Sequence, residues 1–277
     1  MKRTALLILL VFPLALLAQE EKTEKRHNWM LAFDFGTNDM SRKLIRPEQI
    51  REDRYTGYYN YNDGDYGFFG GTNWMSTSYL SVKPEFFIFN NRVGIASGVR
   101  VTTAQTHLVS DRDNFLWRVQ EDGLTTDYVR IKDIWQRSYM AGIPLEIRVF
   151  PNDREWPVQP YFKIGASFNY RFHTKYRVNF LDGAMGDYGS TVQKQLSSGS
   201  SAFSSFLYGA FGLNVSPLFE KSWAPWWTVE IQFPYILLTK NSFAFGGATN
   251  IPGIGFQTSF AIPLGKRAPI GSRELNH

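Results

Sequence analysis

The chain contains no cysteine among its 277 residues. Disulfides, thiolate metal sites and a lipid-modified N-terminal cysteine are therefore excluded. Beyond residue 18 the sequence also lacks any run of 18 consecutive apolar residues, so it offers no transmembrane helix of ordinary length. The net charge of +5 is too small to indicate nucleic-acid binding. Something other than disulfides has to hold the chain together.

The N-terminus has the plan of a secretory signal peptide. Lys2 and Arg3 precede an apolar run from Ala5 to Ala18, which is short for a membrane-spanning helix of about 20 residues. We expect residues 1–18 to be removed on export, and an uncleaved N-terminal anchor is the alternative. Removal lowers the net charge by two, from +5 to +3.

Alternation of apolar and polar residues with a period of two recurs in eight segments, which predicts β-strands. Most segments are ten to fifteen residues long. Such lengths exceed the usual soluble strand and suit a tilted strand that crosses a bilayer, which needs about nine to eleven residues. The segments are 28–37, 77–89, 92–104, 136–150, 158–172, 203–215, 226–238 and 253–264.

Short and long connections alternate strictly between these segments. Asn90 and Asn91 form the shortest, and a pair of Asn tolerates the positive φ of a tight turn. In an antiparallel up-and-down barrel, alternate connections lie at the same end, so one end has tight turns and the other long loops. That asymmetry is typical of outer-membrane barrels with periplasmic turns and extracellular loops. The long connections are 38–76, 105–135, 173–202 and 239–252.

Each segment has an apolar face and a face of small, polar and charged residues. In AGIPLEIRVF, Ile143, Leu145 and Ile147 share one face, while Glu146 and Arg148 share the other. A soluble barrel would turn the apolar face inward around a ligand. The Gly- and Ser-rich polar face suits a narrow interior better, and aromatic residues gather near strand ends as interfacial girdles require. The sequence therefore predicts an all-β fold, an eight-stranded antiparallel up-and-down transmembrane β-barrel.

The inward face carries nearly all the strand charges, four acids and five bases. Because a buried charge persists only when it is paired, we expect an ion-pair network that plugs the lumen. A selectivity path through a narrow pore for small solutes or ions is the alternative. The expected network comprises Asp34, Lys83, Glu85, Arg100, Glu146, Arg148, Lys163, Arg171 and Glu230.

The sequence contains no catalytic motif and predicts no cofactor or metal. His107 and His173 are expected near the outer rim, where a lipid-modifying enzyme would work, but neither forms a His-x-Ser pair on one strand face. An outer-membrane lipid-modifying enzyme is the alternative that these histidines leave open.

The first long connection offers the best prospect for binding. Asn62, Asp63 and Asp65 could supply oxygen ligands to calcium, but the EF-hand spacing is missing. Its aromatic side chains could stack on sugars or contact a protein. The expected surface-binding residues are Tyr58, Tyr59, Tyr61, Asp63, Asp65, Tyr66 and Trp74.

The segment 139–172 resembles the central hairpin of the PorT-like outer-membrane β-barrel family of Bacteroidota. The likeness lies in an IPL strand (Ile143, Pro144, Leu145), a short turn, and a strand with PY and a glycine (Pro160, Tyr161, Gly165). The closing SFAIPLG is also similar. The resemblance implies the barrel fold and an outer-membrane location, and it raises an accessory role in a secretion system as a further alternative.

Together these patterns predict a monomeric outer-membrane protein with a structural or surface-binding role carried by its long extracellular loops. Its expected partners are outer-membrane lipid, the barrel assembly machinery during insertion and an extracellular ligand or protein, but no nucleic acid. Both termini are expected in the periplasm. The chain then divides into a signal peptide (1–18), a barrel (19–264) and a periplasmic tail (265–277).

Overall fold

The computed structural model describes most of the predicted barrel. The predicted signal peptide and the C-terminal tail lie outside the described residues, as does most of the first long connection. The described ranges are 28–44, 50–51, 74–89, 92–109, 115–120, 126–151, 158–198, 200–215, 225–239, 242–244 and 246–264.

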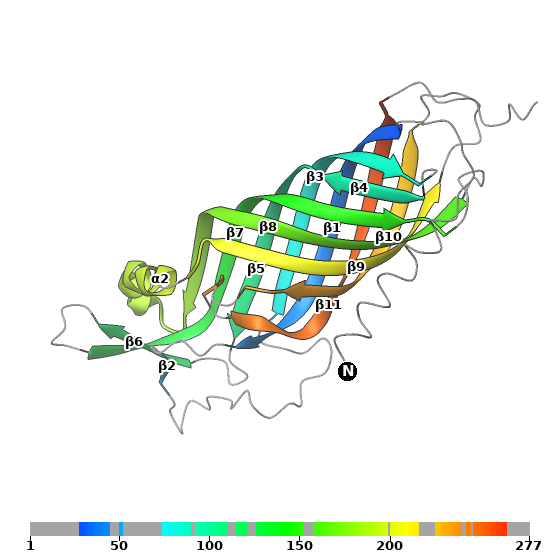
Figure 1. Ribbon diagram of the computed structural model, residues 1–277. Helices are drawn as coiled ribbons and strands as arrows, with labels where there is room; N and C mark the ends of the chain where they lie inside the picture. Colours follow the sequence, from blue (N-terminus) through cyan, green and yellow to red (C-terminus); the bar gives the residue numbers. More distant parts are fainter. Residues whose placement is uncertain are drawn as a thin grey trace, which may run out of the picture.

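The strands close into a ring of eight positions (Figure 1). β1 pairs with β11 on one side and with β3 on the other, and β4 and β5 together occupy the position between β3 and β7. Every neighbouring pair is antiparallel, which confirms the predicted fold class. The ring strands are β1 (Asn28–Leu44), β3 (Trp74–Ile88), β4 (Val93–Ser97), β5 (Val99–Val109), β7 (Thr126–Val149), β8 (Val158–Phe180), β9 (Phe203–Val215), β10 (Trp226–Leu237) and β11 (Gly246–Pro263).

The two ends of the ring differ as the connection lengths predict. At the short-turn end β1 begins and β11 ends, where the backbone N–H of Leu264 donates to the carbonyl of Trp29 at 2.8 Å. Asn90 and Asn91 lie outside the described residues, but the N–H of Arg92 after them donates to the carbonyl of Phe89 before them at 2.9 Å, which closes the turn, and Phe89 itself has a φ of 50°. The opposite end, from which the long connections emerge, is called the long-loop end below.

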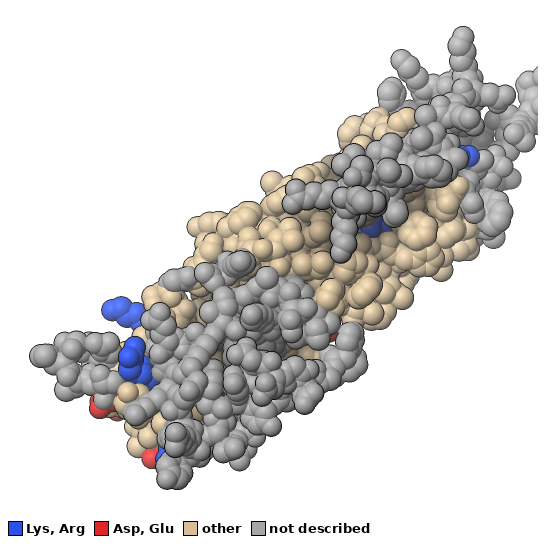
Figure 2. Space-filling model, turned by 60° about the horizontal axis from the view of Figure 1, so that its bottom comes forward, with Lys and Arg blue, Asp and Glu red and all other residues tan. Residues whose placement is uncertain are grey.

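The outer face of the barrel is an apolar belt. Ile147 of β7 and Ile164 of β8 are register partners, and their side chains are 52% and 57% exposed. On β7 from Tyr139 to Val149 and on β8 from Val158 to His173, every exposed side chain is uncharged. Figure 2 shows this belt as a broad tan surface, with most of the visible basic and acidic side chains toward the ends. Exposure of this much apolar surface is stable only in lipid, so the barrel is transmembrane.

The long-loop end holds more regular structure than its sequence predicts. β7 has 24 residues and β8 has 23, so both continue well past the belt. There β7 pairs with β6 (Phe115–Gln120), and β6 pairs with the short β2 (Ile50–Arg51). The segments expected as loops at 105–135 and 173–202 therefore contain strands and helices. Figure 1 shows β6 and α2 beyond the barrel.

The connection after β8 is also ordered. The 3-10 helix η1 (Gly183–Tyr188) leads into α2 (Gly189–Ser197), within the segment 173–202 that the sequence predicts as a long connection. Val192 and Leu196, one helical turn apart on α2, are buried against Trp117 and its neighbours. Nε1 of Trp117 donates to Oε1 of Gln195 at 2.8 Å. We call this unit, formed by β6, the outer parts of β7 and β8, η1 and α2, the outer module.

The outer half of β10 departs from the predicted alternation. The alternation in segment 226–238 puts Tyr235 and Leu237 on the same apolar face as Val229, yet both are buried inside the barrel. The register with β9 and β11 shifts between Gln232 and Tyr235, where Pro234 has no N–H to contribute to the ladder. The shift turns the following residues to the other face.

A charge placed on the belt should block insertion. We expect Ile147→Lys and Ile164→Lys each to cost about 2–4 kcal/mol, because a cation at the bilayer midplane loses its hydration. The measurement is the heat-dependent gel mobility of the folded protein and its unfolding midpoint in guanidinium. Gln193→Lys, on the exposed face of α2, is the matched control and should insert normally. Equal assembly of all three variants would contradict the transmembrane belt.

Candidate functional site: the charged lumen

Eight of the nine charged residues predicted for the lumen lie there, and all eight are buried. They are four acids and four bases, so the network is neutral. Every one of them makes an ion pair with another member. The acids are Asp34, Glu85, Glu146 and Glu230, and the bases are Lys83, Arg100, Arg148 and Lys163.

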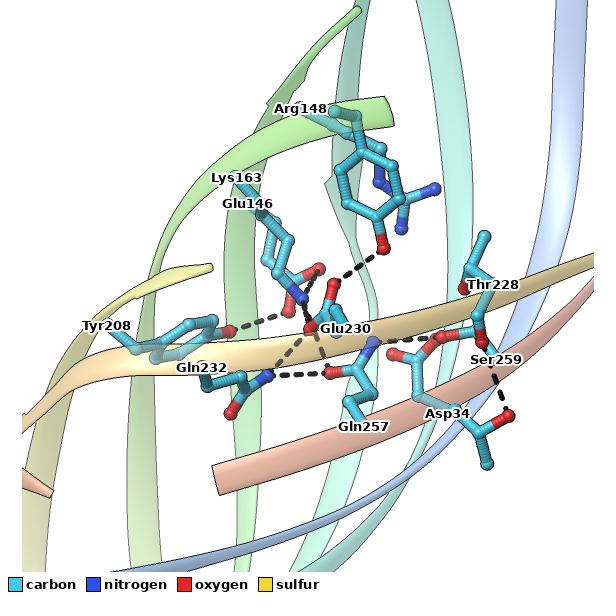
Figure 3. A network of polar contacts seen from close by, with 12 residues as sticks. Asp34, Glu146, Arg148, Lys163, Tyr208, Thr228, Glu230, Gln232, Gln257 and Ser259 are labelled. Carbon is cyan, nitrogen blue, oxygen red and sulfur yellow. Dashed lines mark hydrogen bonds and ion pairs between the residues drawn. The ribbon is translucent and has the colours of Figure 1, made fainter. Parts of the chain in front are cut away.

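Glu146 of β7 is the centre of the network. Its Oε2 accepts from Lys83 of β3 and lies 3.6 Å from Nζ of Lys163 on β8. Its Oε1 accepts from Arg100 of β5 at 3.0 Å and from the hydroxyl of Tyr208 on β9 at 2.6 Å. One carboxylate therefore joins strands that lie on several sides of the barrel, and Figure 3 shows Glu146 with Lys163 and Tyr208 beside it.

A second centre lies at Glu230 of β10. It accepts from Lys163 and, at 2.8 Å, from the hydroxyl of Tyr161. Nε2 of Gln232 lies 2.8 Å from Oε1 of Glu230 and 2.9 Å from Oε1 of Gln257 on β11. Lys163 thus connects the two centres, since it is paired with both Glu146 and Glu230.

Asp34 and Glu85 are the two remaining acids of the network. Oδ2 of Asp34 lies 2.5 Å from Nζ of Lys83 and accepts from the hydroxyl of Ser81 at 2.7 Å. Glu85 pairs with Arg148 at 3.3 Å, across β4, which lies between their strands. Between β3 and β7 the base of each strand therefore pairs with the acid of the other, Lys83 with Glu146 and Arg148 with Glu85. Pairs two residues apart on one strand, Lys83 with Glu85 and Glu146 with Arg148, are not the ones formed.

Glycines make room for these crossings. A Cβ added at Gly94 of β4 would lie 2.4 Å from Oε1 of Glu85, so a larger residue would displace the Glu85–Arg148 pair. Such a small residue between two strands allows their long side chains to meet.

Three tyrosines of the network each lie over a glycine on the neighbouring strand. A Cβ on that glycine would come within 2.5 Å of the ring in every case. The register partners are Gly36 with Tyr79, Gly165 with Tyr208, and Gly212 with Tyr161.

These tyrosines were not among the expected site residues. Arg100 packs over the ring of Tyr79, 4.1 Å from its centroid, and Arg148 packs over Tyr161 at 4.6 Å. Cation–π contact and hydroxyl donation together give the desolvated charges additional partners. Tyr79 lies four residues from Lys83 and Tyr161 lies two residues from Lys163, so each tyrosine shares the inward face of its strand with a charged residue. This even spacing is the sequence signal that could have identified them.

Layers of apolar side chains flank the charged region on both sides. Toward the short-turn end lie Phe87, Phe150, Tyr161 and Trp226. Toward the long-loop end lie Met75, Met140, Phe206, Tyr235 and Phe243, the last from the connection between β10 and β11. The inward turn of Tyr235 and Leu237 described above supplies part of this second layer. The charges thus form a polar layer between two apolar ones.

Arg171 is the one predicted network member that lies elsewhere. Its guanidinium donates to the carbonyl of Ser242 at 2.8 Å, to Oγ of Ser200 at 2.7 Å and to the carbonyl of Ser201 at 3.0 Å. The prediction was wrong because β8 has run beyond the charged layer at this point, next to a register shift against β7. Arg171 instead ties two connections to the rim at the long-loop end.

Each of the two rim histidines stacks on an aromatic ring. His107 stacks on Trp135 at 3.7 Å between ring centroids, and His173 stacks on Tyr139 at 5.8 Å. Burial lowers the pKa of His107, and the Asp133 carboxylate 3.9 Å away opposes this shift only in part. Ser110 and Asp111 lie outside the described residues.

The described part of the chain has no cluster of three or more His, Asp or Glu arranged to hold a metal ion. No helix within it is long and apolar enough to cross a membrane. Of the residues expected to bind a surface ligand, Trp74 begins β3 and its Nε1 donates to Asp39 at 3.1 Å. Tyr58, Tyr59, Tyr61, Asp63, Asp65 and Tyr66 lie outside the described residues.

Comparisons with known proteins give similarity of fold only. No family model and no curated protein matches the chain, so they add no support to the PorT-like resemblance. Among solved structures, Neisserial surface protein A is 9% identical with a TM-score of 0.38, covering 86% of this chain and 99% of that one. Outer membrane protein AlkL is 11% identical with a TM-score of 0.33, covering 90% and 95%. The fold assignment rests on this chain's own strand pairing.

The central position of Glu146 leads to a graded prediction. Glu146→Gln should destabilise the barrel by about 3–5 kcal/mol, because three buried cations lose their shared acid. Glu85→Gln is the matched change and should cost less, since only Arg148 is paired with that carboxylate in the described structure. The measurement is guanidinium unfolding of the protein folded in lipid vesicles. Equal losses from the two variants would argue against Glu146 as the centre.

Proposed function

We propose that this protein is an outer-membrane β-barrel with a closed lumen that binds a partner at the cell surface through its long-loop end. The observation that carries the proposal is the three-layer lumen, in which a neutral ion-pair network lies between apolar layers. A lumen filled in this way leaves the ends of the barrel as the places for interaction. The secretory plan of the N-terminus supports the outer-membrane location.

The outer module makes the long-loop end the better candidate for binding. β7 and β8 carry it beyond the belt, and Trp117, Val192 and Leu196 give it a core of its own. An ordered module presents neighbouring loops in a fixed geometry, which lowers the entropic cost of binding. We propose that the end bearing this module faces outward, that both termini face the periplasm, and that the protein acts as a monomer without catalysing a reaction.

The proposal includes two possible partners of the barrel. The PorT-like resemblance raises an accessory role in a secretion system, and the barrel assembly machinery is the partner that insertion would require. Neither is needed for surface binding. The narrow pore is the less favoured function because its path would have to cross both apolar layers and the paired charges.

Lumen closure should be measurable as an absence of conductance. We expect purified protein in planar bilayers to give no steady current, because Glu146 and its partners occupy the polar path through the barrel. A barrel of known conductance inserted in the same bilayer is the positive control. A steady current that changes when Glu146 or Arg148 is neutralised would establish the pore instead.

Surface binding should depend on the aromatic side chains of the first long connection. Intact cells displaying the protein would be applied to an array of immobilised glycans, and we expect retention on at least one glycan class because aromatic rings stack on sugars. A variant with Tyr58, Tyr59, Tyr61 and Tyr66 changed to Ser should lose this retention. The matched control changes Tyr128, an exposed tyrosine of the outer module, to Ser. Equal retention of cells with and without the protein would contradict the proposed binding to glycans.

A further inference from the structure

Three basic side chains lie together on the outward face of β7 and β8, immediately beyond the apolar belt. Arg137 and Lys175 are direct register partners, and Arg177 is two residues further along β8, opposite Trp135. All three are exposed. We call Arg137, Lys175 and Arg177 the basic row.

The register places the basic row at the level where lipid headgroups begin. On the belt side, the next outward pair is Tyr139 with His173, whose rings stack at 5.8 Å. Beyond that pair come Tyr170 and Phe172, exposed by 63% and 60%. Arg137 is two residues from Tyr139, about 7 Å along the strand. Aromatic residues mark the membrane–water interface, so the basic row lies just on its aqueous side.

Among the described residues, no acid makes an ion pair with a side chain of the basic row. Arg137 donates to Oε1 of Gln105 at 3.1 Å, and Nε of Arg177 donates to Oδ1 of Asn179 at 3.3 Å, so both partners are neutral amides. Asp133 lies on the same outward face, where its carboxylate accepts from Asn179 at 2.7 Å, and it makes no ion pair with the basic row. The side chain of Lys175 makes no hydrogen bond or ion pair with the described part of the chain.

Two like charges directly opposite each other destabilise an antiparallel pair. Arg137 and Lys175 are in this arrangement, and neither makes an ion pair with an acid among the described residues. An anion placed between them would offset the repulsion. Phosphate suits such a site, because guanidinium groups bind phosphate oxygens in a bidentate manner and lysine binds them as a point charge.

We propose that the basic row binds the phosphate-bearing headgroup of an anionic membrane lipid whose acyl chains lie along the adjoining belt at Tyr170 and Phe172. The continuity of the row with the belt is what favours a lipid over free phosphate, since only a lipid uses both surfaces. This site is on the barrel wall and is independent of the surface binding proposed for the loops.

Native mass spectrometry of the full chain tests the site. The protein would be solubilised in mild detergent with equal amounts of phosphatidylglycerol and phosphatidylcholine, and the bound lipids counted. We expect preferential retention of phosphatidylglycerol. Changing Arg137, Lys175 and Arg177 together to Gln should reduce this preference at least about tenfold, because each basic side chain near an anionic headgroup contributes on the order of 1 kcal/mol, or about fivefold.

The control removes the same charge elsewhere on the outer module. Arg130, Lys132 and Lys194 are exposed and further from the belt, and changing all three to Gln should leave lipid retention unchanged. Heat-dependent gel mobility shows that both triple variants are folded. An equal reduction in both variants, or no preference for phosphatidylglycerol in the unaltered protein, would overturn the proposal. Complete competition by millimolar inorganic phosphate would also overturn it, by identifying a site for the free ion.

Discussion

The requirement that every buried charge be paired governs the inside of this barrel. Removing a single ion from water costs several kcal/mol, and the lumen leaves the charged layer little alternative to protein partners. Glu146 meets this requirement for three bases at once, and Lys163 shares its charge with Glu230 as well. The strand positions of these residues fix how the strands must be ordered around the barrel. The network therefore favours one register of the ring over its alternatives, in the way that polar groups in other folds select a single arrangement.

Small residues and tyrosines make that pairing geometrically possible. Gly94 lets Glu85 and Arg148 meet across an intervening strand, and Gly36, Gly165 and Gly212 accept the rings that lie over them. The tyrosine hydroxyls then satisfy carboxylates and amides that ion pairs alone leave with free lone pairs. Packing and charge are thus coupled, because a ring that moved off its glycine would also withdraw a hydrogen bond from the network.

Alternation in the sequence was enough to predict the eight ring positions, the lipid face and eight of the nine lumen charges, because the period of two is imposed by strand geometry. It failed where the geometry is interrupted. Pro234 reverses the faces of β10 at Tyr235, and a register shift takes Arg171 away from the network. The pairing partners could not be read from spacing on one strand, since they depend on the cross-strand register. The outer module was missed because its core joins short segments distant in sequence, such as Trp117 with Leu196.

The neutrality of the lumen has a consequence for how this protein can change over evolutionary time. Four acids and four bases balance inside the wall, so replacing one of them alone leaves an uncompensated charge in the membrane core. Charged positions can then be exchanged only in compensating pairs, or by way of uncharged intermediates. Gln232 and Gln257 already take part in the network without charge. The charged residues of the interior are therefore constrained together. The loops do not share this requirement for charge balance, so they can diversify one residue at a time.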